Sequence, residues 1–200
     1  MKRIYIICSL AVFLGIAGGI SFFLIRDANA AVPASTTFIT QSGDTYQFGK
    51  DHTKLKLIEF IYTHCPDVCP TTTQKMVELK QDLLKKGVYG KTIEFVTITI
   101  DPFRDTPEIL NEYKQGFGIK NDNNWIFLTG AKQEIKNNQK QLLKIANALQ
   151  FQFKDPGNGQ FIHSTFTYLV SEDNKFIAKF PMGKEFNKQD VYDKIMEKIE

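Results

Sequence analysis

The chain has 200 residues, with 25 Lys and Arg against 22 Asp and Glu and a formal net charge of +3. Lys2, Arg3, Arg26 and Asp27 lie in or beside an apolar N-terminal segment, and the remaining charges give residues 31–200 a net charge of +1. This near-neutral charge gives no reason to expect nucleic-acid binding or a strongly electrostatic membrane patch, and the segment is long enough for one domain with a hydrophobic core.

The N-terminal segment is apolar. Residues 4–25 contain no charged side chain, and this length suits a transmembrane helix, which needs about 20 apolar residues. It exceeds the roughly 7–15 residues of a signal-peptide core. Lys2 and Arg3 would keep the N-terminus in the cytoplasm and place the rest of the chain outside. Residues 28–30 resemble a signal-peptidase site, so cleavage after Ala30 is the alternative to the retained anchor that we favour.

The composition changes after this segment. Residues 31–42 are rich in Ala, Thr, Ser and Pro and are predicted to form a linker that runs into a short strand near Phe38. Residues 45–48 are expected to form the second strand of a hairpin. We therefore predict a single folded domain at 43–200, preceded by the linker and by an anchor or signal segment at 1–30.

The first central strand is followed by two of the three cysteines. Residues 55–62 are apolar on both faces, as in a strand that is covered on both sides of a sheet. Thr63-His64-Cys65-Pro66-Asp67-Val68-Cys69-Pro70 follows directly, and an amphipathic helix is predicted over 71–86. The cysteines thus lie between the carboxyl end of a strand and a helix N-terminus. Open α/β sheets place their sites there, and the helix dipole favours a thiolate.

The rest of the chain alternates strands and helices. Asp101 and Pro102 end the second buried strand, and Asp105 or Thr106 is predicted to cap the next helix. No internal repeat or low-complexity tract interrupts this order. The predicted strands lie at 92–100, 125–129, 161–170 and 175–180, and the predicted helices at 105–115, 132–149 and 187–199.

This order of elements predicts the fold class α/β. Strands that alternate with helices imply a largely parallel sheet with helices on both faces, and the C-terminal hairpin adds antiparallel strands. A cysteine pair after the first core strand of such a unit is typical of a thioredoxin-like domain. The expected architecture is therefore a thioredoxin-like fold with a central mixed sheet flanked by helices, plus an N-terminal transmembrane helix.

The Cys-x3-Cys spacing limits the chemistry of the pair. If residues 65–69 form one helical turn, Cys65 and Cys69 lie on the same face with Cα atoms roughly 6 Å apart. A disulfide tolerates this span, and the same geometry would let both sulfurs bind one soft metal ion. Dithiol redox chemistry and metal binding are therefore both open, and a static disulfide or two buried thiols is the structural alternative.

Three motifs resemble one known family. They are 63–70 with both cysteines, Asp101-Pro102 with Asp105-Thr106-Pro107, and His163-Ser164 before Tyr168-Leu169-Val170. In this order they resemble the SCO/SenC family of membrane-anchored, thioredoxin-like copper proteins, which help to assemble the dinuclear copper centre of cytochrome c oxidase. The resemblance covers most of residues 40–200.

The resemblance implies that Cys65, Cys69 and His163 bind copper. Thiolates suit Cu(I) and imidazole suits both copper states, whereas zinc usually takes a fourth ligand. On its own, His163 would be interpreted as a structural histidine. The resemblance also implies that Asp101 influences copper binding or redox behaviour without being a ligand, with a structural turn residue as the alternative. Ile162 stands where many members carry an acidic residue, so no carboxylate is expected there.

Two functions from different classes follow. The first is a membrane-anchored copper metallochaperone that delivers copper to, or prepares the cysteines of, the copper-accepting subunit of cytochrome c oxidase. Other copper chaperones or thiol-disulfide reductases would be further partners. The second is an extracytoplasmic thiol-disulfide oxidoreductase with Cys65 and Cys69 as its catalytic redox pair. Dithiol exchange does not need His163, whereas a copper site does, so this histidine discriminates between the two functions.

Overall fold

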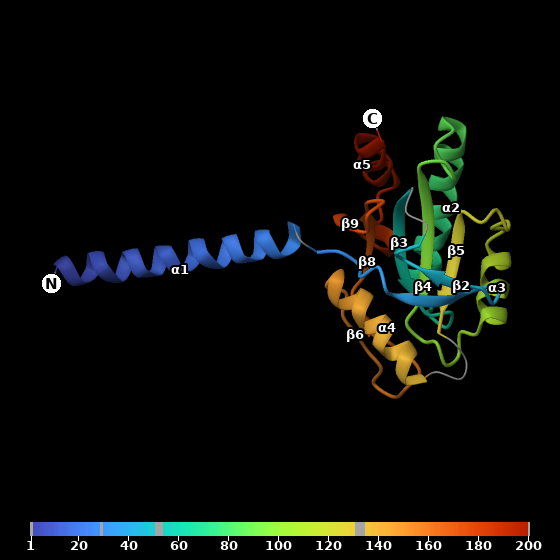
Figure 1. Cartoon of the computed structure of the whole chain (residues 1–200), viewed down its shortest axis with the longest axis horizontal. Coiled ribbons are helices and arrows are strands. Elements are labelled where there is room, and N and C mark those ends of the chain that lie inside the picture. Colours follow the sequence, from blue (N-terminus) through green and yellow to red (C-terminus); the bar gives the residue numbers. More distant parts are fainter. Residues whose placement is uncertain (1, 29, 51–53, 131–134, 200) are drawn as a thin grey trace. The chain divides into compact units, whose positions relative to one another are not determined.

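The computed structural model describes residues 2–28, 30–50, 54–130 and 135–199. The chain divides into two compact units, Met1–Ala30 and Ala31–Glu200 (Figure 1). All of the residues that the sequence analysis connects with chemistry lie in the second unit.

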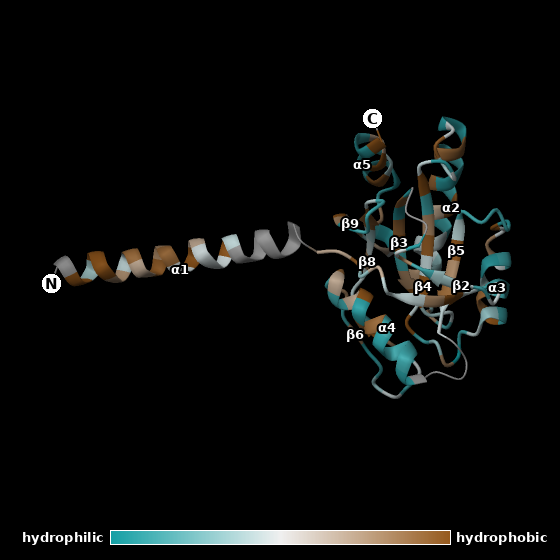
Figure 2. Ribbon diagram, in the orientation of Figure 1, coloured by the Kyte–Doolittle hydropathy of each residue, from teal (hydrophilic) through white to brown (hydrophobic). Residues whose placement is uncertain are grey.

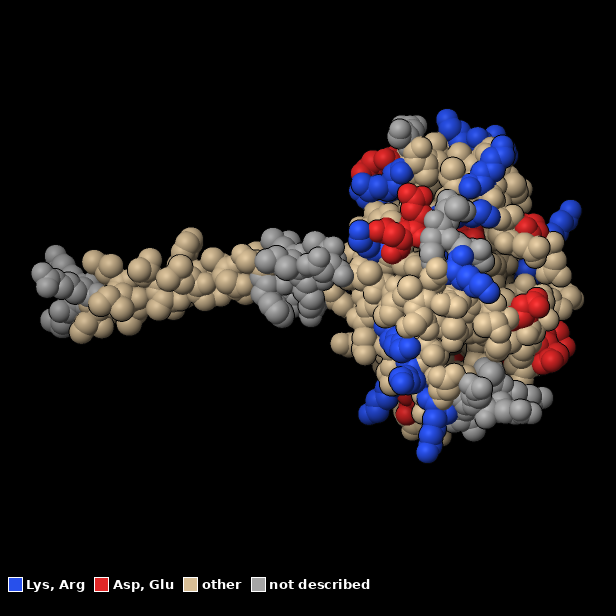
Figure 3. Space-filling model, in the orientation of Figure 1, with Lys and Arg blue, Asp and Glu red and all other residues tan. Residues whose placement is uncertain are grey.

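The N-terminal unit is one helix, α1 (Lys2–Ala28). Its stretch Ile4–Ser21 has a mean hydropathy of 2.2 and is not buried against protein. Figure 2 shows this stretch as predominantly hydrophobic, and Figure 3 shows no Lys, Arg, Asp or Glu along it. By length and composition α1 can cross a membrane, a test that an N-terminal signal sequence also passes. The alternative cleavage site includes Asn29, which lies outside the described residues.

The second unit is built on a seven-stranded mixed sheet with strand order β2-β1-β5-β4-β3-β8-β9. The three central strands β3, β4 and β5 are parallel, and two antiparallel hairpins, β1–β2 and β8–β9, form the edges. The strands are β1 (Thr37–Thr40), β2 (Thr45–Gln47), β3 (Leu55–Ile61), β4 (Ile93–Thr99), β5 (Trp125–Thr129), β8 (Phe166–Val170) and β9 (Phe176–Pro181). The predicted mixed α/β architecture is confirmed.

Helices cover this sheet. They are α2 (Val68–Lys86), α3 (Pro107–Gly116), α4 (Ile135–Ala148), α5 (Lys188–Ile199) and the short 3-10 helix η1 (Gly183–Glu185). α2 contacts α5 and η1, α3 contacts β5, and α4 contacts β1. Every residue of β3 and β4 is buried, as expected for central strands that are covered on both faces.

The folded unit begins at Ala31, earlier than the boundary at residue 43 that the sequence suggested. Val32 and Phe38 are buried in the core, and β1 pairs with both β2 and β5. Residues 31–42 therefore belong to the domain, because their few apolar side chains reach the core despite the polar composition around them.

The helix that follows the cysteines starts earlier than predicted. α2 begins at Val68, so Cys69 lies in its first turn and only Cys65 precedes the helix. Pro70 does not prevent this, because the N–H groups in the first turn of a helix have no partner inside it. Gly87 ends the helix in the left-handed conformation.

The predicted strand 161–170 is interrupted. β7 (Ile162–His163) pairs with β6 (Phe153–Lys154) in a separate two-stranded sheet, and only β8 joins the large sheet. The predicted single strand at 161–170 is therefore wrong for His163, which lies in the small sheet and not in the sheet that contains β3. The predicted start of α4 at Lys132 lies outside the described residues.

Candidate metal centre

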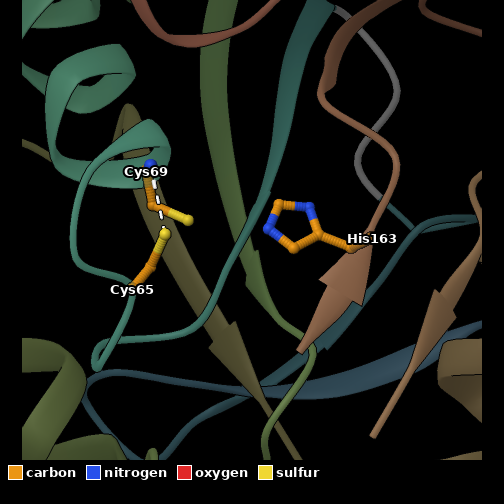
Figure 4. A group of neighbouring side chains, drawn as sticks. All are labelled: Cys65, Cys69 and His163. Carbon is orange, nitrogen blue, oxygen red and sulfur yellow. Dashed lines mark hydrogen bonds between the residues drawn. The ribbon is translucent and has the colours of Figure 1, made fainter. Parts of the chain in front are cut away.

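The two cysteines lie where β3 leads into α2, with Cys65 in a tight turn before the helix and Cys69 in the first turn of the helix. The N–H of Cys65 donates to the carbonyl of Tyr62 at 3.0 Å, and the N–H of Cys69 donates to Sγ of Cys65 at 3.4 Å (Figure 4). Cys69 is fully buried and Cys65 is half-buried. Both are free thiols, so the fold of the turn, and not a disulfide, holds the two sulfurs close together.

A buried carboxylate holds the start of this turn. Asp105 accepts hydrogen bonds from the N–H of Thr63 at 3.0 Å and from the hydroxyl groups of Thr63 and Thr99. The helix cap is Thr106, whose hydroxyl accepts from the N–H of Ile109. Asp105, the alternative cap in the sequence analysis, instead connects the turn after β3 to the end of β4.

The third residue of the group comes from the small sheet. The ligand atoms of Cys65, Cys69 and His163 all lie within 4.8 Å of one another, and Figure 4 shows the imidazole directed toward the cysteine pair. Metal–sulfur bonds are about 2.3 Å long, so two sulfur ligands of one ion lie at most about 4.6 Å apart. The three side chains need only small movements to hold one ion.

Three contacts orient the His163 ring. Its centroid lies 5.9 Å from that of Tyr62 and 6.1 Å from that of Phe151. Nδ1 lies 2.9 Å from the carbonyl oxygen of Ser164. When Nδ1 carries the proton and donates it to this carbonyl, Nε2 keeps a free lone pair, the form in which a histidine binds a metal.

The two thiols differ in their affinity for a proton. Hydrogen bonds from Cys69 and His163 lower the pKa of the Cys65 thiol to about 4, against the effect of burial. The pKa of the Cys69 thiol is raised by its hydrogen bond to Cys65 and by burial. Burial is the largest single effect on His163 and lowers its pKa, but the hydrogen bonds to Cys65 and to the Ser164 carbonyl, together with the charge of Cys65, outweigh it, and the net shift is upward. The pair therefore consists of one thiolate, Cys65, and one thiol, Cys69.

Iodoacetamide should alkylate Cys65 at a pH well below the value of about 8.5 at which an ordinary thiol ionises. Cys69 should stay unmodified, because it is fully buried and keeps its proton. Alkylation of the reduced, metal-free protein across a pH series, followed by fragmentation of the peptide that carries both cysteines, locates the label. Equal labelling of the two sulfurs, or reaction of Cys65 only at alkaline pH, would contradict this assignment.

A buried carboxyl group lies beside the cysteine turn. Glu59 in β3 is fully buried and accepts a 2.7 Å hydrogen bond from the Thr97 hydroxyl. The Thr73 hydroxyl connects it to the turn, 3.4 Å from both Glu59 oxygens and 3.1 Å from the carbonyl of Cys69. Burial raises the pKa of Glu59 to about 7. Sequence reasoning missed this residue, although an acidic side chain in a strand of mostly apolar residues was a visible signal.

Glu59 should make the fold less stable as the pH rises from about 4.5 to about 7. Its pKa in the folded state lies above the ordinary value of 4.5, so in this window the unfolded chain ionises first and the free energy of unfolding falls, by about 3 kcal/mol. Glu59→Gln cannot ionise and should lack this fall. Urea unfolding of both proteins, reduced and metal-free, measures the difference. Parallel pH profiles would refute this role for Glu59.

Asp101 lies just after β4, which ends at Thr99 and is the parallel neighbour of β3, so it is close to the strand end where the sequence placed it. Its buried carboxylate pairs with Arg104. Among the described residues, the group whose ligand atoms converge consists of the two cysteines and His163, without Asp101. An influence of Asp101 on a bound metal therefore stays a prediction, and it would have to act through another side chain.

The geometry fits a soft metal ion, and comparisons with known proteins agree. A profile of the SCO1/SenC family matches residues 26–200. The chain belongs to the SCO1/SenC family. A SCO2-like protein of Rickettsia typhi is 36% identical over 152 residues, which cover 76% of this chain and 71% of the relative. The resemblance seen in the sequence motifs is confirmed.

Solved structures of SCO proteins share the fold. A SCO1/SenC lipoprotein of Bacillus anthracis is 25% identical, with a TM-score of 0.72 over 86% of this chain and 97% of that one. ScoI of Arabidopsis thaliana, solved with copper bound, is 26% identical, with a TM-score of 0.65 over 84% and 98%. BsSco, described as a cytochrome c oxidase assembly protein with a disulfide switch, is 25% identical, with a TM-score of 0.69 over 84% and 93%.

Proposed function

We propose that this protein binds one copper ion through Cys65, Cys69 and His163 and delivers it to the copper-accepting subunit of cytochrome c oxidase. The observation that carries the proposal is the convergence of two sulfurs and one imidazole within 4.8 Å. The sulfurs come from the connection between β3 and α2, and the imidazole comes from the small β6–β7 sheet. Thiolates are soft ligands for Cu(I), and imidazole suits both copper states. The copper-bound structure of the Arabidopsis relative supports copper as the ion.

Delivery requires that a partner can reach the ion. Cys65 is half-buried, whereas Cys69 is fully enclosed. An incoming thiolate of the partner would displace Cys65 first, because this ligand faces solvent, and the buried Cys69 would release the ion last. In this transfer, thiolates of the partner replace the thiolates of this protein as ligands of the copper ion, and the oxidation state of the copper does not change.

Copper transfer tests this function. The reduced chain, loaded with one equivalent of Cu(I), is mixed with the copper-free soluble domain of the oxidase subunit, and copper in each protein is measured after separation. We expect copper to move to the acceptor. Copper that stays on the donor while the acceptor binds free copper normally would reject delivery as the function.

The low pKa of Cys65 favours a second candidate, a thiol-disulfide oxidoreductase. The Cys65 thiolate would attack a disulfide of the partner and form a mixed disulfide, releasing one partner thiolate. Cys69 would then lose its proton and attack Cys65, which releases the second partner thiolate and leaves Cys65 and Cys69 oxidised. The partner gains two electrons and the pair loses two. The disulfide switch described for BsSco supports this alternative.

We propose further that α1 stays attached and anchors the domain on the outer side of the cell membrane. Lys2 and Arg3 precede the apolar stretch, which fits the positive-inside rule, and the Bacillus anthracis relative is a lipoprotein. The mature protein should therefore fractionate with membranes and retain residues 1–30. N-terminal sequencing measures this, and a mature N-terminus at Ala31 would show cleavage instead.

A further inference from the structure

The segment that brings His163 to the cysteines is held by a side chain from the loop after β4. Arg104 pairs through Nε with the buried carboxylate of Asp101, and its Nη2 donates to the carbonyl of Gly159 at 3.0 Å. Its guanidinium also lies 6.0 Å from the centre of the Phe161 ring. Arg104 therefore connects the end of a central strand to two residues that lead directly into β7.

A second side chain holds the same segment from β3. The Tyr62 hydroxyl donates to Oε1 of Gln160 at 3.0 Å, and the Tyr62 ring lies 5.4 Å from that of Phe161 and 5.9 Å from that of His163. Arg104 thus contacts Gly159 and Phe161, and Tyr62 contacts Gln160, Phe161 and His163. This matters because, among the strands that the structure describes, β7 pairs with the short strand β6 alone and lies outside the large sheet.

The residue type at position 104 suits this task. Arg104 is the only arginine in residues 31–200, a region that otherwise uses lysine. A planar guanidinium can bind a carboxylate and a carbonyl at the same time in a fixed geometry, whereas a lysine ammonium cannot reproduce this fork. Gly159 has a φ of +81°, and a Cβ there would lie 3.3 Å from Nη1 of Arg104, so a glycine permits both the turn and the close approach.

We propose that Arg104 is a positioning residue that holds His163 at the metal centre. Asp101 fixes the guanidinium, the guanidinium fixes Gly159 and Phe161, and β7 follows. This inference rests on the proposed function, because its readout is bound copper. It also gives Asp101 a route to influence the metal without contacting it. The cysteines lie on a different element, so the loss of Arg104 affects the nitrogen ligand selectively.

The test compares Arg104→Met with the native chain, both full length and reduced. We expect Cu(II) affinity to fall about tenfold, within the range that loss of a group supporting a ligand usually causes. The copper–thiolate absorption and the nitrogen hyperfine signal should shift toward those of His163→Ala, and Cu(I) affinity should change much less. Arg104→Lys should restore the signal only partly, because the ammonium cannot serve both acceptors.

Lys188→Met is the matched control. Lys188 pairs with Asp82 and its side chain is 36% exposed, against 37% for Arg104. Asp82 lies about 20 Å along α2 from Cys69, so this variant removes an equally exposed cation from an ion pair far from the metal centre and should leave the copper spectrum unchanged. If Arg104→Met does not fold, Arg104→Lys takes its place: it keeps a cation beside Asp101 but loses the fork that also binds Gly159, so Cu(II) affinity should still fall and a native Cu(II) affinity and spectrum would overturn the proposal.

The outcomes separate this inference from the proposed function. Suppose that His163→Ala changes the Cu(II) affinity and spectrum, but folded Arg104→Met protein keeps the native values. This result overturns the positioning role of Arg104 and leaves the proposed copper site intact. A copper spectrum that changes equally in Lys188→Met also overturns it. If His163→Ala itself leaves copper binding unchanged, the proposed copper site fails.

Discussion

Cys65→Ala and Cys69→Ala should each abolish high-affinity copper binding. Each variant leaves the ion with one sulfur and one nitrogen, and the second soft thiolate that favours Cu(I) is lost. We expect a loss of affinity greater than about a hundredfold, beyond what removal of an outer supporting group causes. Competition with a chromophoric Cu(I) chelator measures it on the reduced protein.

Cys8→Ala is the matched control, because Cys8 is a free, exposed cysteine on α1 outside the folded unit. It should bind copper as the native chain does. Cys69→Ala has a second consequence: the hydrogen bond from Cys69 is the largest cause of the low pKa of Cys65, so this pKa should rise. Single cysteine variants that bind Cu(I) as tightly as the native protein would place the site elsewhere.

His163→Ala should weaken Cu(II) binding more than Cu(I) binding. Nitrogen is a harder donor than sulfur, so the imidazole contributes most to the oxidised ion. The copper–thiolate absorption should change, and Cu(II) affinity should fall by more than the tenfold expected for Arg104→Met, since the ligand itself is removed. Dithiol-disulfide exchange by Cys65 and Cys69 should survive, because thiolate attack does not require that nitrogen.

His64→Ala controls for this variant, since His64 is an exposed histidine next to Cys65. It should leave the copper spectrum unchanged. A purely structural role for His163 predicts a lower melting temperature with an unchanged spectrum. If folded His163→Ala protein binds Cu(II) with native affinity and spectrum, this histidine is not a ligand and the oxidoreductase alternative gains.

The sequence was sufficient for the fold class and for the cysteine motif, because both depend on local patterns. Alternating apolar strands and amphipathic helices indicated the central sheet, and a short spacing placed Cys65 and Cys69 in one turn. Only the family resemblance connected His163 to them. Its position in β7 depends on the β6–β7 pairing, which short strands of mixed polarity do not reveal in the sequence.

The supporting residues were beyond sequence reasoning for a different reason. The spacing of Asp105 suited a helix cap, yet its carboxylate binds Thr63 across the β3–β4 strand pair. Arg104 reaches Gly159, which is distant in the sequence. Such contacts depend on which strands become neighbours and on side-chain rotamers. Neither property is encoded in periodicity or in a local motif.

Copper titration of the reduced native chain tests the central claim most directly. Electronic absorption and paramagnetic resonance follow Cu(II), and X-ray absorption identifies the ligands of Cu(I). We predict saturation at one copper per chain, with two sulfur ligands from Cys65 and Cys69 and one nitrogen ligand from His163. Binding that does not saturate, or a saturated site without sulfur ligands, would contradict the assignment of this group as a copper centre.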